Sequence, residues 1–162
     1  MKEYFSLVIA FVTGIWILWN YYFKRLFAPK IKINISGEIL GFDIRNNALL
    51  RTSLVIQNVG EVRLKINKIF LTVRGIKDSS VFKNGGPEIL NQIDFDKKIY
   101  QENLIPKDWE YTFVDSGVIQ EYNHSVLIPK QIQYLLIEAK MYYKNSIDFQ
   151  IASKVLKVKY ND

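Results

Sequence analysis

The first hydrophobic pattern along the chain is an uncharged run from Phe5 to Phe23, in which Asn20 is the one strongly polar residue. At ~1.5 Å of rise per residue, a helix over this run would be about 28 Å long, close to the ~30 Å hydrocarbon core of a bilayer. We therefore expect a transmembrane helix at 5–23, between a short flank at 1–4 and a basic linker at 24–29. A cleavable signal peptide or a buried soluble helix would also be apolar. A signal peptide, however, is shorter and has its basic residues in front.

Side chains that favour the edges of a bilayer stand near this run. Rings of Trp and Tyr prefer the headgroup region, and basic side chains prefer the cytoplasmic side. The expected membrane-anchor residues are Phe5, Trp16, Trp19, Tyr21, Tyr22, Lys24 and Arg25. Four basic residues follow the run closely and one precedes it. We therefore expect a single-pass protein of the cell membrane with its C-terminal domain in the cytoplasm.

Two small residues inside the run, Ala10 and Gly14, have the spacing of a small-xxx-small pair. Such a pair lets the backbones of two helices approach closely. The same spacing is also frequent in ordinary helices. Ala10 and Gly14 are therefore candidate helix-packing residues only.

Beyond Pro29 the hydrophobic pattern changes to a period of two, which is typical of half-buried strands. Runs of this kind occupy 31–35, 49–57, 62–74, 109–114, 133–143 and 147–160. In the third run the apolar positions change parity near Lys68, which predicts a bulge or bend. The last two runs flank a short polar turn, which predicts a hairpin. No long amphipathic helix separates the runs, so we expect residues 30–162 to form an antiparallel β-sandwich.

The middle of the chain, residues 76–108, has a less regular pattern. Asn84-Gly85-Gly86 is typical of a turn, and a short strand is expected near Val81. Between 89 and 99 some alternation is interrupted by charges. An edge strand and a loop both remain open there.

Three segments resemble bacterial immunoglobulin-like β-sandwiches. SLVIQNVG followed by LKINKIFLTV resembles their B and C strands, in which an apolar strand ends at Asn-x-Gly. LIPKDWEYTF resembles the segment that enters a later strand, and IEAKMYYKNSIDFQ is similar to their last strand pair. The resemblance covers most of residues 30–160. It implies an all-β fold, an immunoglobulin-like antiparallel β-sandwich behind one N-terminal transmembrane α-helix, and it implies no activity.

The net charge of +6 is concentrated near the N-terminus. Residues 1–32 contain five basic residues and one acidic residue, whereas residues 33–162 contain seventeen and fifteen. The best basic cluster, formed by Arg63, Lys65 and Lys68, is typical of a solvated strand face. It is not the dense stripe of a phosphate-backbone binder. We expect no nucleic-acid partner.

Candidate catalytic and metal-binding residues are few. The chain has no cysteine and a single histidine, His124, which we expect in an exposed loop. Ser116 and Ser125 lack the context of a nucleophile that His124 would activate. Asp94 and Asp96 fall short of a calcium loop. We expect no catalytic residue, metal site or cofactor, and therefore no enzyme.

The aromatic residues exceed what a single sandwich core requires. Trp109, Tyr142 and Tyr143 are candidates for partner binding, because Trp and Tyr are enriched in interface hot spots. Alternation places Tyr142 and Tyr143 on opposite faces of their strand, and core packing is the other explanation for each ring.

The hypothesis that follows is a non-enzymatic binding or assembly module at the inner face of the membrane. Its expected partners are the lipid bilayer and another membrane or cytoplasmic protein, or a second copy of the chain. One alternative is a ligand-gated membrane effector, in which a β-rich sensor is coupled to an oligomerising helix; in architecture this resembles small bacterial defence effectors. Another alternative is an envelope protein of reversed topology.

Overall fold

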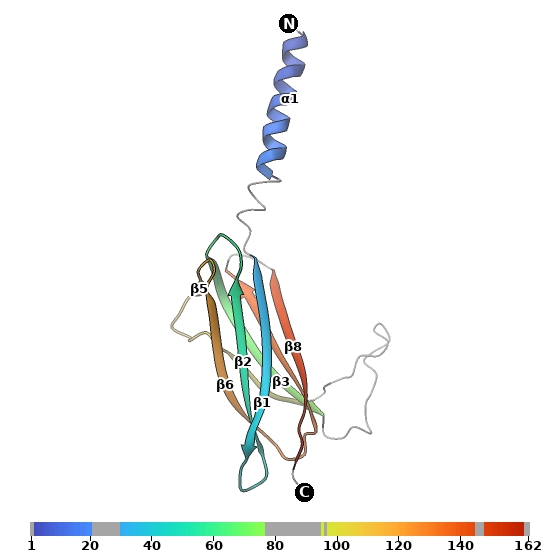
Figure 1. Ribbon diagram of the computed structural model, residues 1–162, viewed down its shortest axis with the longest axis vertical. Coiled ribbons are helices and arrows are strands. Elements are labelled where there is room, and N and C mark those ends of the chain that lie inside the picture. The colour runs from blue at the N-terminus through green and yellow to red at the C-terminus, as the bar shows by residue number, and fades with distance from the viewer. Residues whose placement is uncertain (1, 21–29, 77–94, 96, 145–147, 161–162) are drawn as a thin grey trace, which may run out of the picture.

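The computed structural model describes residues 2–20, 30–76, 95, 97–144 and 148–160, with side chains from Val8 onward (Figure 1). These residues form one α-helix and eight strands. The helix is α1 (Lys2–Leu18). The strands are β1 (Ile31–Phe42), β2 (Ala48–Asn58), β3 (Leu64–Ile76), β4 (Lys97–Asn103), β5 (Thr112–Val114), β6 (Ile119–Ile128), β7 (Tyr134–Tyr143) and β8 (Phe149–Lys157).

The α-helix covers only part of the expected membrane span. Helix α1 begins at the charged Lys2 and ends at Leu18. It therefore includes residues 5–18 of the span, about 21 Å at ~1.5 Å per residue, which is short of the ~30 Å hydrocarbon core. Among the described residues, no helix has both the length and the apolar character that crossing a membrane requires. The predicted transmembrane helix at 5–23, and with it the single-pass membrane localisation with a cytoplasmic C-terminal domain, is wrong.

The residues assigned to the anchor have different outcomes. Trp16 and Trp19 are exposed, at 66% and 60%. Tyr21, Tyr22, Lys24 and Arg25, and the side chain of Phe5, lie outside the described residues. Ala10 and Gly14 lie within α1, and a Cβ added at Gly14 would meet no atom within 4 Å. Their role in helix packing stays a prediction.

The strands form two antiparallel sheets. Sheet A has the order β1-β2-β6, and sheet B has the order β4-β3-β7-β8, with β5 pairing with the start of β3. In Figure 1 sheet A lies in front of β3, and β1 lies beside β8 at one edge. The buried residues of both sheets form one core, which includes Leu54, Ile56, Val73, Ile137 and Met141. The prediction of an all-β antiparallel sandwich is confirmed.

Gly37 of β1 lies against side chains of the core. A Cβ built at this glycine would lie 2.3 Å from Cδ1 of Ile137 in β7, closer than two carbon atoms can pack. A larger residue at position 37 would therefore require the Ile137 side chain to move.

The predicted bulge in β3 is also confirmed. The pairing of β3 with β7 shifts by one residue between Ile66 and Lys68. Ile66 and Ile69 are consequently both buried, although two residues lie between them, a spacing that places side chains on opposite sides of a regular strand. Lys65 and Phe70 point away from the core on either side of the shift. The bulge lets one strand keep its apolar side inward along its whole length.

Three strands differ from the sequence prediction. β5 is shorter than the predicted run 109–114, and β4 occupies part of the undecided middle segment. β6 was not predicted, because its central residues Glu121–Ser125 are polar on both sides of the strand. The turn expected at Asn84 and the strand expected near Val81 lie outside the described residues.

Candidate binding face

Aromatic and basic side chains gather on the side of sheet B that points away from the core. Residues directly opposite each other in adjacent strands share a face. Phe70 of β3 lies opposite Lys140 of β7, and Tyr142 of β7 lies opposite Phe149 of β8. We name this surface the aromatic–basic face. It comprises Arg63, Lys65, Lys68, Phe70, Tyr111, Phe113, Lys140, Tyr142, Lys144, Phe149 and Ile151.

The centre of the face is a row of three rings around Tyr142. Its ring centroid lies 6.1 Å from that of Phe70, in an edge-to-face arrangement, and 5.8 Å from that of Phe149. These are the favourable geometries for aromatic pairs. The ammonium of Lys140 lies 3.8 Å from the Phe149 centroid and 5.3 Å from the Tyr142 centroid. The row therefore combines exposed apolar area with a cation held over a ring.

A second cluster surrounds Tyr111, just before β5. The ammonium groups of Lys144 and Lys65 lie 4.0 Å and 5.4 Å from its ring centroid. Lys144 also donates a 2.8 Å hydrogen bond to the carboxylate of Glu110. This bond and the positive charge of Lys144 hold the pKa of Glu110 below its ordinary value. The cluster thus pairs one of its two lysines with a carboxylate of the chain.

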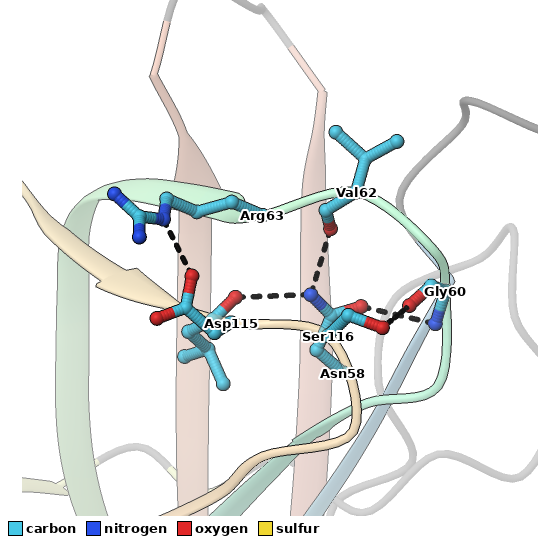
Figure 2. A network of polar contacts seen from close by, with 7 residues as sticks. Asn58, Gly60, Val62, Arg63, Asp115 and Ser116 are labelled. Carbon is cyan, nitrogen blue, oxygen red and sulfur yellow. Dashed lines mark hydrogen bonds and ion pairs between the residues drawn. The ribbon is translucent and has the colours of Figure 1, made fainter.

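A third cluster lies where β3 begins. The guanidinium of Arg63 lies 4.5 Å from the ring centroid of Phe113 and donates a hydrogen bond to Asp115 (Figure 2). Here too a cation lies over a ring and meets a carboxylate. The three clusters repeat one arrangement along the face: an aromatic ring with a basic group above it.

The loops that carry Arg63 and Asp115 are held together by a buried amide, Asn58. Its Nδ2 donates to the carbonyl oxygens of Val62, at 2.8 Å, and Val114, at 2.9 Å, and its Oδ1 accepts from the amide of Gly60 (Figure 2). The side chain is fully buried, and these bonds satisfy its donors and its acceptor. Asn58 therefore ties the loop after β2 to the end of β5.

Two further bonds join the same loops. The hydroxyl of Ser116 donates to the carbonyl oxygen of Gly60, at 2.7 Å, and the amide of Gly117 donates to the carbonyl oxygen of Asn58, at 2.9 Å. Gly117 has a φ of 75°, a left-handed conformation that glycine adopts without steric cost. The Asn-x-Gly sequence at 58–60, which begins at the last residue of β2, thus joins the loop after β2 to the segment after β5 by hydrogen bonds. These bonds position one end of the aromatic–basic face.

The three predicted partner-binding residues have different surroundings. Tyr142 lies at the centre of the aromatic–basic face. Tyr143 points to the other side of β7 and packs against the core, where burial raises the pKa of its phenol. Trp109 is 58% exposed and precedes β5. Alternation thus separated the two tyrosines correctly without saying which one faces outward.

The structure adds residues that the sequence interpretation did not propose for binding. Phe70, Phe149 and Lys140 form the centre of the face with Tyr142. A signal was present in the parity of β7, where the apolar residues Leu135, Ile137, Ala139 and Met141 alternate with Tyr134, Leu136, Glu138, Lys140 and Tyr142. Once the smaller set is assigned to the core, the rings of the other set must point outward.

The predicted exposed loop histidine is wrong. His124 lies in β6, half-buried, and its ring stacks on that of Tyr100 in β4, with 4.9 Å between centroids. Burial and the hydrogen bond to Glu102 raise the pKa of Tyr100 to about 12. His124 therefore closes the edge between the two sheets.

The outer side of sheet A provides a contrast. We name this surface the sheet A outer face. It comprises Lys32, Asn34, Ser36, Glu38, Leu40, Leu49, Arg51, Ser53, Val55, Gln57, Ile119, Glu121, Asn123, Ser125 and Leu127. Two of these residues are basic, two are acidic and none is aromatic.

Metal ligands and a nucleophile do not come together in the described part of the chain. It contains no group of three or more His, Cys, Asp or Glu side chains that could hold a metal ion. Ser116 donates its hydroxyl to Gly60, and Ser125 follows His124 in the same strand, so their side chains point to opposite faces. Asp94 and Asp96 lie outside the described residues.

No protein-family model matches the sequence, and no curated protein matches it. Solved structures are similar in fold. A protein described as ApaA from Bordetella pertussis aligns over 81% of this chain and 95% of its own, with 11% identity and a TM-score of 0.52. A structural-genomics target aligns over 82% and 94%, with 10% identity and a TM-score of 0.50. At these identities the likeness shows the all-β fold alone.

Proposed function

We propose that this chain is a non-enzymatic binding module, built on an immunoglobulin-like sandwich, that engages a protein partner through the aromatic–basic face. The observation that carries the proposal is the grouping of exposed rings and basic groups on one side of the molecule. Aromatic residues and Arg are enriched at protein interfaces and dominate their binding energy. The grouping includes Arg63, Tyr111, Tyr142 and Phe149.

The exposed apolar area supports binding rather than a merely solvated strand face. Phe149 and Ile151 are 46% and 49% exposed, and they lie beside Tyr142 and Phe70. A contiguous exposed apolar patch that is rimmed by polar groups is typical of an interaction site. The strands below it are fixed by pairing to the core, so binding would cost little ordering of the backbone.

The ligand-gated effector has less support. It requires a helix that crosses a membrane, and the residues described here contain none of sufficient length and apolar character. A binding module needs only a rigid surface with complementary chemistry. The immunoglobulin-like assignment rests on the three sequence segments and on the sandwich formed by β1–β8.

Site-specific photo-crosslinking tests the proposal in the cells that produce the protein. A benzophenone amino acid replaces Phe149 in the full chain, and in a second variant it replaces Asn123 on the sheet A outer face. Both positions are solvent-facing and lie in strands, so the pair is matched. We expect a discrete crosslinked protein from position 149 and none from position 123, because the face at 149 is in contact with a partner.

Two results would contradict the proposal. One is the absence of any crosslinked protein from position 149 when the full chain is folded and abundant. The other is an identical set of products from positions 149 and 123, which indicates random collisions. A further variant with the probe at Val155, which lies farther along β8, shows how far the contact extends.

A further inference from the structure

Two cations at the centre of the aromatic–basic face have no carboxylate partner among the residues that the structure describes. Lys68 lies opposite Tyr142, and Lys140 is two residues from Tyr142 in the same strand. The two lysines are therefore diagonal neighbours, with Cα atoms about 7–8 Å apart. Neither forms an ion pair with any residue that the structure describes. The centre of the face thus carries two positive charges that form no ion pair with a described residue, and the nearest acid on this side of β7 is Glu138, two residues before Lys140.

The two outer clusters show how this face accommodates a carboxylate. Lys144 lies over the ring of Tyr111 and binds the carboxylate of Glu110. Arg63 lies over the ring of Phe113 and binds Asp115. In both, a cation that rests on a ring keeps its hydrogen-bonding groups available to an acid. The carboxylates come from this chain.

The central cluster has the ring and the cation without the acid. Lys140 lies 3.8 Å from the centroid of Phe149. By charge complementarity, we propose that a carboxylate of an acidic polypeptide segment completes this cluster at Lys140 and Lys68. This inference rests on the proposed binding function and names the class of its partner. The apolar side chains of the same segment contact Phe149 and Ile151.

The chemistry of the face favours a polypeptide over a nucleic acid. Single-stranded nucleic acids bind through bases stacked on free aromatic rings. A base that stacked on Phe149 from the side of Lys140 would displace the lysine from the ring. The exposed apolar area of Phe149 and Ile151 also needs apolar contacts, which a phosphate backbone does not offer. An acidic polypeptide supplies carboxylates and apolar side chains together.

Fluorescence anisotropy of the full chain in a nonionic detergent tests this inference. The first probe is a labelled peptide in which Glu alternates with Leu. The second has Gln in place of each Glu, and the third is a labelled single-stranded oligothymidylate. We expect the Glu peptide to bind at least about tenfold more tightly than either of the others, because only it combines negative charge with apolar side chains. The affinity should fall as salt is raised.

Protein variants locate the site. The double variant Lys68→Gln with Lys140→Gln removes both of these charges, and we expect it to weaken binding of the Glu peptide by about tenfold or more. The matched control is Lys32→Gln with Arg51→Gln, which removes two basic residues from the sheet A outer face. The control should bind the peptide within about twofold of the unmodified chain.

Three results would overturn the inference: equal affinity for the Gln and Glu peptides, tighter binding of the oligonucleotide, or unchanged peptide binding in the Lys68 and Lys140 double variant. These failures are distinct from a failure of the proposed function. A chain that still yields a discrete crosslink at position 149, but prefers the Gln peptide or the oligonucleotide, binds a partner of another class. A chain without that crosslink loses both proposals.

Discussion

The two outer faces of the sandwich are built on the same kind of strand and differ in what they present. The sheet A outer face has two basic and two acidic residues, and short hydroxyl and amide side chains dominate its centre, where Ser53 donates to Glu121 at 2.7 Å. The aromatic–basic face has five basic residues and five aromatic rings, and two of its basic residues, Arg63 and Lys144, are paired with the carboxylates of Asp115 and Glu110.

The difference shows that the core does not determine the outer surfaces. Both faces alternate with buried residues in strands of similar length, and the register fixes only which side chains point outward. The sheet A outer face presents short polar residues and separate aliphatic side chains such as Ile119 and Leu127. The aromatic–basic face presents neighbouring rings instead, which the proposed partner would explain.

The largest expected effect comes from removing the tie that fixes one end of the aromatic–basic face. Asn58→Ala leaves the carbonyl oxygens of Val62 and Val114 and the amide of Gly60 without this partner. At about 1 kcal/mol for each lost bond, the free energy of unfolding should fall by about 3 kcal/mol. Chemical denaturation monitored by tryptophan fluorescence measures this change in the free energy of unfolding.

The matched control for this change is Asn123→Ala, which removes an exposed asparagine from the sheet A outer face. We expect it to alter the free energy of unfolding by less than about 0.5 kcal/mol. Equal effects of the two substitutions would show that the amide of Asn58 does not hold the loops.

An intermediate effect is expected from the rings themselves. Phe149→Ala removes a half-exposed ring that contacts Tyr142 and Lys140. Its loss should lower the free energy of unfolding by about 1 kcal/mol, because the ring is only partly withdrawn from water. Leu127→Ala on the sheet A outer face is the control, with a smaller expected loss. If Phe149→Ala proved as costly as a core truncation, the ring would serve mainly folding.

The smallest expected effects concern the pKa values of two carboxyl groups, Glu110 beside the aromatic–basic face and Glu121 on the sheet A outer face. The pKa of Glu110 is lowered first by the hydrogen bond from Lys144 and by its charge, whereas the pKa of Glu121 is lowered first by the hydroxyl of Ser53. Raising the salt concentration should move the pKa of Glu110 toward its ordinary value and leave that of Glu121 nearly unchanged, because salt screens charges. NMR titration of the side-chain carboxyl carbons measures both.

The sign of the pH dependence follows from these shifts. Because each folded pKa lies below its unfolded value, each group contributes stability above the unfolded pKa and loses it as the pH falls through the folded pKa. The Lys144→Gln variant should raise the pKa of Glu110 toward the ordinary value. An unchanged pKa in that variant would mean that the ion pair does not form in solution.

Periodicity predicted the sandwich because most strands have one apolar side. The bulge near Lys68 was readable for the same reason, since the parity of buried residues changes there. β6 was not readable, because its inward positions at Tyr122 and His124 are polar or amphipathic and lie at the edge of the core. The place of His124 depends on its contact with Tyr100, which is distant in sequence.

The candidate face was only partly predictable. Tyr142 and the basic residues Arg63, Lys65 and Lys68 stood out in the sequence, but their convergence depends on which strands pair. Phe149 reaches Tyr142 only because β8 pairs with β7, and Tyr111 reaches Lys144 because β5 pairs with the start of β3. The membrane prediction failed where it treated apolar composition alone as a measure of helix length.

Asn67 is the extra residue of the bulge in β3, and it reverses which positions of the strand point outward. Upstream of it Lys65 lies on the outer side of the strand, and downstream Lys68, Phe70 and Arg74 do. Deleting that single residue while the downstream half keeps its place would turn Leu64 and Ile66 toward water and Lys65 toward the interior. A substitution at Asn67 keeps the number of residues in the bulge, so both parts of β3 keep their apolar sides inward. The number of residues at this point is therefore more tightly constrained than the residue type.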